Sequence, residues 1–173
     1  MIRTWGYITV NIIVFVLLQV LVMNNIHLFG VVVPFIYIYI ILKFPVDITR
    51  SRMVLLSFFI GLLIDIFSNT FGMHAAACTL AGFVRTPLLE RFVDVREMPA
   101  DSIPTYRLFG LGRFLRYTVF LVSIHHVALF LIESFTLFQP VMMITRMLSG
   151  ILLTMMLIFI LEAFNLSKSK SGE

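Results

Sequence analysis

Long apolar runs separated by short polar stretches dominate the chain from residue 7 to residue 164. A helix needs roughly 20 mostly apolar residues to cross about 30 Å of hydrocarbon. Most of these runs approach that length, and the charged residues lie mainly between them. The pattern therefore predicts an all-α, polytopic membrane bundle with six transmembrane helices, over residues 7–23, 26–42, 53–67, 72–84, 117–137 and 141–164.

Two spans and two connecting segments have features of their own. Pro34 lies within the second span, where we expect a kink because proline removes a helix hydrogen bond. The fourth span, 72–84, gives only about 20 Å of helix, so it must tilt little, extend past Arg85 or be sheltered by neighbouring helices. Residues 85–116 carry several prolines and glycines, which predicts one long loop. The chain from 1 to 166 is then a single transmembrane domain, and the Ser- and Lys-rich tail 167–173 is expected to be disordered.

The composition agrees with a membrane protein. Of 173 residues, 60% are apolar and only 13% are charged, whereas a soluble domain has about 25% charged residues. The basic residues behind the net charge of +4 are spread between the apolar runs, so we expect no nucleic acid partner. Cys78 is the only cysteine, which excludes an internal disulfide and a CxxC site and leaves a role in packing.

The distribution of lysine and arginine predicts how the chain is threaded, because these residues concentrate in short cytoplasmic loops. With the N-terminus inside, 12 of the 13 basic residues fall in cytoplasmic segments. Arg146 is the exception, at or within the start of the sixth span. Removing or adding one span would break this alternation. The charges therefore support six spans with both ends in the cytoplasm.

Three charged residues within or at the edge of spans fall at a similar depth near the outer side. At 1.5 Å per residue, Asp65 and Glu133 lie about 20 to 24 Å beyond the cytoplasmic ends of their helices, and Arg146 enters the sixth span from outside. Because buried charges need partners, we expect Arg146 to pair with Glu133, Asp65 or both. The alternative, in which each side chain only reaches water at the outer interface, stays open.

Small residues predict where helices approach closely. Gly61 and Asp65 are four residues apart and share a helix face, so a neighbouring helix can approach the side that carries the carboxylate. That pattern favours a packed, functional face. A second stripe of small residues runs along the fourth span, where plain helix packing is the simplest interpretation.

Candidate chemistry is sparse. His126 and Glu133 share a face, but His125 and His126 point about 100° apart and no HExxH motif accompanies them, so we expect no metal. His27 and His74 are placed near the outer surface. The sequence contains no GxSxG motif, Walker-type loop or paired acids, so enzymatic activity and a bound cofactor are not expected.

The long loop combines cations with apolar side chains. Thr86-Pro87 is a good helix opening, and apolar residues at helical spacing up to Val93 alternate with charged residues up to Glu97, which predicts a short interfacial helix. Arg107, Arg113 and Arg116 then alternate with large apolar residues. Such a segment suits a position among anionic head groups, and docking of a cytoplasmic partner is the alternative.

Together, Pro34 in the second span, Gly61-Leu-Leu-Ile-Asp65 closing the third and Gly72 opening a small-residue fourth resemble the rod shape-determining protein MreD family. The likeness covers nearly the whole chain in span order and length, although its motif is short. The segment from Arg107 to Arg116 and the adjacent histidines are similar to the form found in Bacteroidetes-type bacteria.

The resemblance implies a non-enzymatic subunit of the cell-elongation machinery. Members of that family lie in the cytoplasmic membrane with the single-span protein MreC, the MreB filament, and the RodA glycosyltransferase with its transpeptidase partner, and help direct lateral peptidoglycan synthesis. The family is also thought similar in fold to the substrate-binding S-components of energy-coupling-factor vitamin transporters. The surface around Gly61 and Asp65 is then expected to recognise the MreC span. A vitamin-type uptake subunit and a membrane hydrolase remain as rivals.

Overall fold

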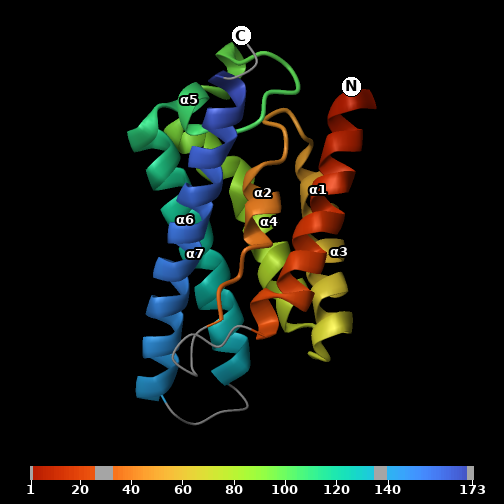
Figure 1. Cartoon of the computed structure of the whole chain (residues 1–173), viewed down its shortest axis with the longest axis vertical. Helices are drawn as coiled ribbons and strands as arrows, with labels where there is room; N and C mark the ends of the chain where they lie inside the picture. The colour runs from red at the N-terminus through yellow and green to blue at the C-terminus, as the bar shows by residue number, and fades with distance from the viewer. Residues whose placement is uncertain (1, 26–32, 135–139, 171–173) are drawn as a thin grey trace.

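The computed structural model describes residues 2–25, 33–134 and 140–170, and these residues form helices and connecting segments without strands. Figure 1 shows the longer helices side by side along one axis. The elements are α1 Ile2–Leu21, the 3-10 turn η1 Met23–Asn25, α2 Ile38–Leu42, α3 Arg50–Ser68, α4 Met73–Phe92, η2 Val95–Glu97, α5 Tyr106–Phe109, α6 Leu111–Ser134 and α7 Pro140–Lys170.

Four of these helices are long and apolar enough to cross a membrane, with apolar windows at Ile8–Asn25, Arg50–Ser68, Leu111–Glu133 and Val141–Phe164. Their outward faces carry large apolar side chains such as Val141, Leu152 and Phe164, which are 71 to 79% exposed. Large exposed apolar side chains are also present on α1, α3 and α6, as expected of helices that face lipid. The predicted all-helical bundle with transmembrane helices is therefore confirmed at this level.

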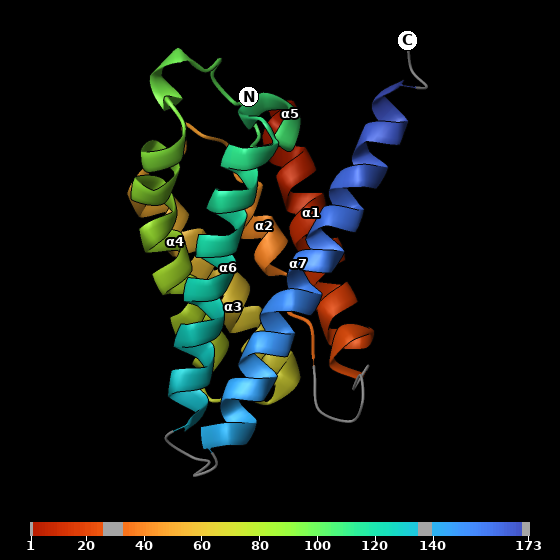
Figure 2. The same ribbon diagram turned by 90° about the vertical axis from the view of Figure 1, so that its left-hand side faces the viewer.

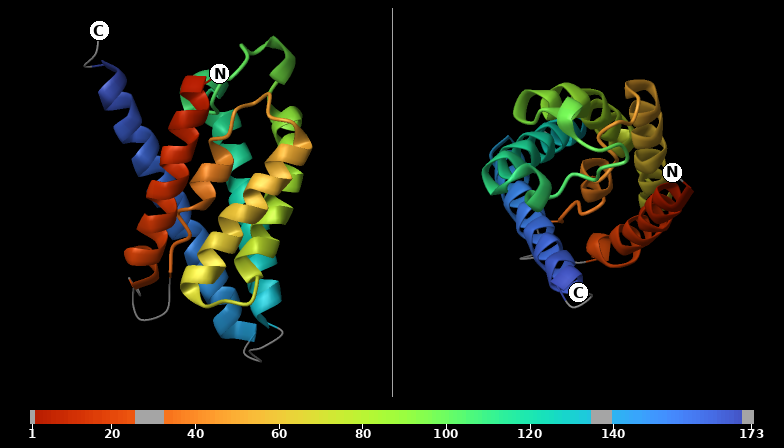
Figure 3. Two further views of the ribbon diagram at one scale, coloured as in Figure 1. Left: turned by 90° about the vertical axis from the view of Figure 1, so that its right-hand side faces the viewer. Right: turned by 90° about the horizontal axis from the view of Figure 1, so that it is seen from above.

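The core lies around α2, which the other helices enclose. Viewed along the bundle axis, α2 lies inside a ring formed by α1, α3, α4, α6 and α7 (Figure 3, right). Ile38, Ile41 and Leu42 are completely buried. A helix that is apolar all round belongs in such a central position.

The chain runs repeatedly between the two ends of the bundle. In Figures 1 and 2, α1, α3 and α6 run in one direction, and the segment leading into α2, then α4 and α7, run back. The first residues of α1, the last described residues of α7 and the connection from 93 to 110 lie at the same end, which we call the loop end. The turn between α3 and α4 lies at the opposite end, which we call the turn end.

The second predicted span is not one kinked helix. Residues 26–32 lie outside the described part, residues 33–35 are non-helical, and α2 has only five residues. Pro34 therefore stands in a stretch of irregular backbone rather than at a bend in a helix. Irregular backbone at membrane depth is tolerated where it is buried in protein, and this stretch is enclosed by the surrounding helices.

The fourth predicted span is longer than expected, because α4 continues through Pro87 to Phe92. Arg85 and Leu89 are buried on either side of that proline, so packing holds the last turns of α4 in place. The predicted short helix beginning at Thr86-Pro87 is thus the end of α4, and the structure shows the extension past Arg85 that was one of the expected possibilities. The loop narrows to 93–110, since α6 already begins at Leu111.

Part of the segment predicted to be disordered is helical. Helix α7 continues to Lys170, so residues 167–170 are helical, and residues 171–173 lie outside the described part.

Candidate functional site

The turn between α3 and α4 is held by the carboxylate of Asp65, which is 3% exposed. Its Oδ1 accepts a hydrogen bond from His74 N at 3.1 Å, and its Oδ2 accepts one from Ala75 N at 2.7 Å. The Thr70 hydroxyl donates to the same carboxylate. Asp65 therefore caps the first turn of α4, where free N–H groups and the helix dipole both favour an anion.

Two glycines of the MreD-like motif serve the same turn. A Cβ added to Gly61 would lie 2.6 Å from Ala75 Cα, so only glycine lets α4 approach α3 this closely. Gly72 has a φ of +79°, a left-handed conformation that glycine adopts without strain. Gly61, Asp65 and Gly72 thus form one structural unit, which we call the hairpin lock.

The lock turns the Gly61–Asp65 face inward, against α4. Gly61 and Asp65 are both buried, so the predicted close-packing face exists but packs within this chain. Neither residue offers an exposed surface for the span of a partner protein. Direct contact of the MreC span with Gly61 and Asp65, as expected from the resemblance, would need surface that these two residues do not expose.

The expected charge cluster of Asp65, Glu133 and Arg146 does not form around Asp65. Backbone donors that follow Asp65 in sequence satisfy its carboxylate. The described residues show no ion pair between Arg146 and either acid, and Arg146 Nε is buried without a hydrogen-bond partner. Glu133 lies near the end of α6, half-buried. The tight turn between α3 and α4 places the first N–H groups of α4 next to Asp65, so these groups bind its carboxylate. Arg146 belongs to α7, which is far from Asp65 in sequence.

The irregular stretch before α2 is bonded by side chains of α1 and α7. Gln19, completely buried, donates to Pro34 O at 3.1 Å and accepts from Ile36 N at 2.9 Å. Thr154 accepts from Phe35 N at 3.1 Å. These bonds replace the helix bonds that Pro34 and its neighbours lack, as buried backbone groups require.

Three histidines, His74, His125 and His126, surround the same stretch. We call this cluster the histidine core. The Tyr37 hydroxyl lies 2.7 Å from His74 Nδ1 and 2.9 Å from His125 Nε2. A hydroxyl has one proton, so it donates to one ring nitrogen and accepts from the other. His126 Nδ1 lies 2.9 Å from Val122 O, and Cys78 Sγ lies 3.9 Å from His125 Nε2.

The histidine core corrects the expected position of His74 and was not foreseen as a cluster. His74 is 7% exposed and points into the bundle, rather than lying at the outer surface; His27 lies outside the described part. The described residues hold no group of three or more His, Cys, Asp or Glu side chains placed to bind a metal. The sequence signals were the adjacent His125 and His126 and the aromatic residues on alternate positions from Phe35 to Tyr39, but nothing in them joined these residues to His74.

A buried ion pair lies toward the loop end. Lys43, at the end of α2, pairs with Glu162 of α7, and their side chains are 13% and 3% exposed. The Tyr39 hydroxyl also donates to Glu162 Oε1 at 2.7 Å, and Lys43 Nζ donates to Pro104 O at 2.7 Å. This pair joins α2, α7 and the 93–110 connection. In the sequence, Lys43 falls just beyond the predicted second span, and nothing marks Glu162 as its partner.

Arg85 is buried completely and binds backbone rather than an acid. Its guanidinium donates to the carbonyl oxygens of Phe44 and Pro45. The hydroxyl of Tyr117 donates to Leu42 O at 3.2 Å nearby. These bonds fix the chain where it leaves α2, so Arg85 has a structural role.

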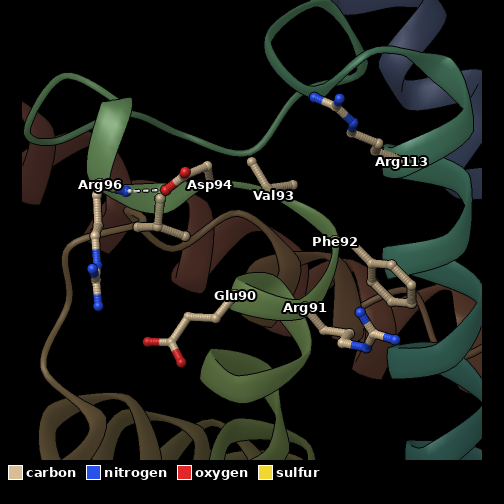
Figure 4. Close-up of a pocket in the computed structure, with 8 residues that line it drawn as sticks. Glu90, Arg91, Phe92, Val93, Asp94, Arg96 and Arg113 are labelled. Carbon is tan, nitrogen blue, oxygen red and sulfur yellow. Dashed lines mark hydrogen bonds between the residues drawn. The ribbon is translucent and has the colours of Figure 1, made fainter.

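The predicted membrane-surface arginines are divided by the structure. Arg113 and Arg116 lie in the first two turns of α6 beside Arg91 of α4, whereas Arg107 lies in α5 and does not line the groove between those helices. That groove comprises two adjoining cavities of about 720 and about 520 Å³, which share Arg91, Phe92 and Arg113. Figure 4 shows Arg91 and Arg113 on either side of Phe92.

Comparison of the chain with protein-family models, with curated proteins and with solved structures finds no match.

Proposed function

We propose that the chain is a non-enzymatic scaffold subunit of the bacterial cell-elongation machinery, embedded in the cytoplasmic membrane. In this role it binds MreC and, with MreB, RodA and its transpeptidase partner, helps direct lateral peptidoglycan synthesis and cell shape. The observation that carries the proposal is the hairpin lock. The residues on which the MreD resemblance depends, Gly61, Asp65 and Gly72, all act in one piece of structure, so their spacing has a physical reason.

We propose six passes through the membrane with both ends in the cytoplasm. The apolar windows of α1, α3, α6 and α7 supply four passes, and the segment that includes α2, together with α4, would supply the other two. The termini and the arginine-rich connection lie together at the loop end (Figure 1). This end would face the cytoplasm, as the distribution of lysine and arginine favours.

A scaffold agrees with how the buried polar groups are used. Gln19, Asp65 and Arg85 each bind backbone groups of a neighbouring segment. Such bonds stabilise the backbone inside the bundle, and the polar groups of these side chains are used for structure rather than for binding a transported ion. A pump would instead need ionisable groups arranged in a relay across the membrane.

The MreC span is proposed to bind the outer side of the α3–α4 hairpin. A largely apolar groove of about 500 Å³ lies there, lined by Val54, Leu55 and Phe58 of α3 and by Thr79 and Phe83 of α4, with Arg50 and Ser51 at its loop end. Leu55 and Phe83 are more than half exposed. A transmembrane helix can fill such a groove by van der Waals packing. The hairpin lock would act indirectly, by keeping the two walls of the groove together.

The test is recovery of MreC with the purified protein from the native membrane. The double variant Phe58→Ala and Phe83→Ala removes the largest side chains of the groove, and we expect it to reduce MreC recovery several-fold. The matched control is Leu152→Ala with Met156→Ala, which truncates two exposed apolar residues on α7. Unchanged recovery with the groove variant, or equal loss with both variants, would contradict this interface.

Depletion of the protein in its native cell tests the broader role. Loss of a scaffold of the elongation machinery should produce rounded cells, whether or not the groove is the MreC site. Normal rods that require an added nutrient would instead favour uptake.

One observation favours a small-molecule uptake subunit as the second candidate. Substrate sites in membrane transporters often form where a helix is interrupted near mid-membrane, and the irregular stretch around Phe35 is such an interruption. The centroid of the Phe35 ring lies 5.3 to 6.1 Å from the ring centroids of His74, His125 and His126. Saturable binding of a vitamin by the purified protein, lost in Phe35→Ala, would support this candidate over the scaffold.

A further inference from the structure

Six basic residues near the loop end differ in whether the chain itself supplies a partner. Lys43 pairs with Glu162, Arg85 binds backbone carbonyls, and the Arg50 guanidinium stacks over the Phe83 ring at 5.0 Å. These three cations therefore have partners within the chain. Arg91, Arg113 and Arg116 are exposed, and no described carboxylate lies within ion-pair distance of them.

The three exposed arginines are gathered in one groove. Arg91 comes from the last turn of α4, and Arg113 and Arg116 come from the first two turns of α6. All three line the cavity of about 520 Å³, where the other lining residues are Leu88, Phe92 and Phe120. That cavity thus has a cationic rim, an apolar floor and no acidic residue among its lining residues.

The acidic residues nearby lie on the other part of the groove. Glu90 and Asp94 line only the larger cavity, and Figure 4 shows Glu90 pointing away from α6. Asp94 already accepts a hydrogen bond from Arg96 N. Among the described side chains, the positive charge on the α6 side of the groove therefore has no neighbouring carboxylate.

The apolar floor continues onto the outer surface of the bundle. Phe92 and Phe120 stack with ring centroids 5.6 Å apart, and Phe120 is 50% exposed. Leu115 and Val119, in the same turns of α6, are 41% and 38% exposed. The charged surface of a soluble acidic protein would not match this apolar extension. A phospholipid matches both parts, because it carries a phosphate and a hydrocarbon chain in one molecule.

We propose that the groove between the end of α4 and the start of α6 binds an anionic phospholipid, with Arg91, Arg113 and Arg116 around its head group and an acyl chain along Leu88, Phe92 and Phe120. The inference rests on the proposed membrane embedding. Guanidinium groups suit this role because they bind phosphate oxygens in pairs, and basic pockets between helices near the cytoplasmic surface bind anionic head groups.

The test measures phospholipid binding by the purified protein in a neutral detergent, with fluorescent phosphatidylglycerol and phosphatidylcholine as probes. We expect the protein to prefer phosphatidylglycerol. The double variant Arg91→Gln and Arg113→Gln should weaken that binding by about tenfold or more, since each arginine near a membrane surface adds a similar share of the attraction. The single variant Arg116→Gln should weaken it less.

The matched control is Arg50→Gln with Arg52→Gln, which removes the same charge from exposed positions at the same end. It should leave the binding nearly unchanged. Equal weakening in both double variants, or no preference for phosphatidylglycerol, would overturn the site. Equal affinity for inorganic phosphate and for phosphatidylglycerol would also overturn it, because a phosphate site needs no apolar floor.

A further variant, Phe120→Ser, tests the acyl-chain contact. It should weaken phosphatidylglycerol binding while leaving the arginines in place, and unchanged binding would contradict the proposed floor. These measurements use the purified protein alone. A negative result therefore counts against the lipid site without bearing on MreC binding, and loss of MreC binding would leave the lipid site standing.

Discussion

Replacement of Asp65 tests the hairpin lock most sharply. The Asp65→Asn variant keeps the size of the side chain but removes its charge and one of its acceptor oxygens. Two backbone donors, His74 N and Ala75 N, now compete for one carbonyl oxygen, and the new amide N–H₂ faces donors instead of acceptors. The first turn of α4 then begins with an unsatisfied buried N–H group.

The magnitude follows from these bonds. A buried donor left without a partner costs about 1–3 kcal/mol, and the lost interaction of an anion with the helix N-terminus adds about 0.3–1 kcal/mol. We therefore expect Asp65→Asn to destabilise the protein by about 2–3 kcal/mol. For a chain of this length such a loss lowers the melting temperature by roughly 4–12 °C.

The assay is thermal unfolding of the detergent-purified protein, followed by loss of the monodisperse peak in size-exclusion chromatography. Asp47→Asn is the matched control, because Asp47 is exposed in the segment that precedes the first residue of α3. The control should melt within about 1 °C of the parent protein, as surface substitutions usually do. Equal melting temperatures for the two variants would refute the role assigned to the Asp65 carboxylate.

Three further predictions concern other buried contacts. Gly61→Leu should prevent folding or lower the melting temperature by more than Asp65→Asn does, because any Cβ meets the backbone of α4; a well-folded variant would contradict the close approach. Glu162→Gln should destabilise by about 3 kcal/mol by leaving Lys43 buried without an anion, and Lys43→Met should recover part of that loss; additive effects in the double variant would show that the two side chains do not interact. Gln19→Leu should cost about 2 kcal/mol or more by orphaning Pro34 O and Ile36 N, so unchanged melting would refute the bonding of the irregular stretch.

The membrane class of the fold could be predicted from the sequence because it depends on length and hydropathy. The apolar runs correctly located the central parts of α1, α3, α6 and α7. Their ends were less accurate. Hydropathy reports where a helix leaves the hydrocarbon, whereas the backbone of α6 and of α7 stays helical beyond that point.

The irregular segment before α2 could not be predicted, because its bonds come from far along the chain. Pro34 indicated a local disturbance of the helix. An apolar run, however, does not distinguish a continuous helix from an extended stretch followed by a short helix. The structure is decided by Gln19 and Thr154, which lie 15 residues before Pro34 and 119 residues after Phe35. Pro87 shows the opposite case, since burial of Arg85 and Leu89 keeps α4 helical across a residue that usually ends helices.

The candidate site was predicted in part. The Gly61 to Asp65 spacing correctly indicated a closely packed face, but spacing alone does not say whether the neighbour is another helix of the same chain. Asp65 and Arg146 lie at a similar depth by residue count, but the free N–H groups at the start of the following helix are much nearer to Asp65 in sequence. The histidine core was missed because its members come from α4, α6 and the segment before α2.

Threading of the chain through the membrane, with the loop end in the cytoplasm, is the claim on which the scaffold and the lipid site both depend. Single cysteines at Phe71, in the turn between α3 and α4, and at Ala100, in the 93–110 connection, test it directly, since both positions are exposed and the native Cys78 is buried. With a membrane-impermeant maleimide on spheroplasts, we predict that Phe71→Cys is labelled at once and Ala100→Cys only after the membrane is permeabilised. Labelling of Ala100→Cys on sealed spheroplasts, or protection of Phe71→Cys, would contradict the account.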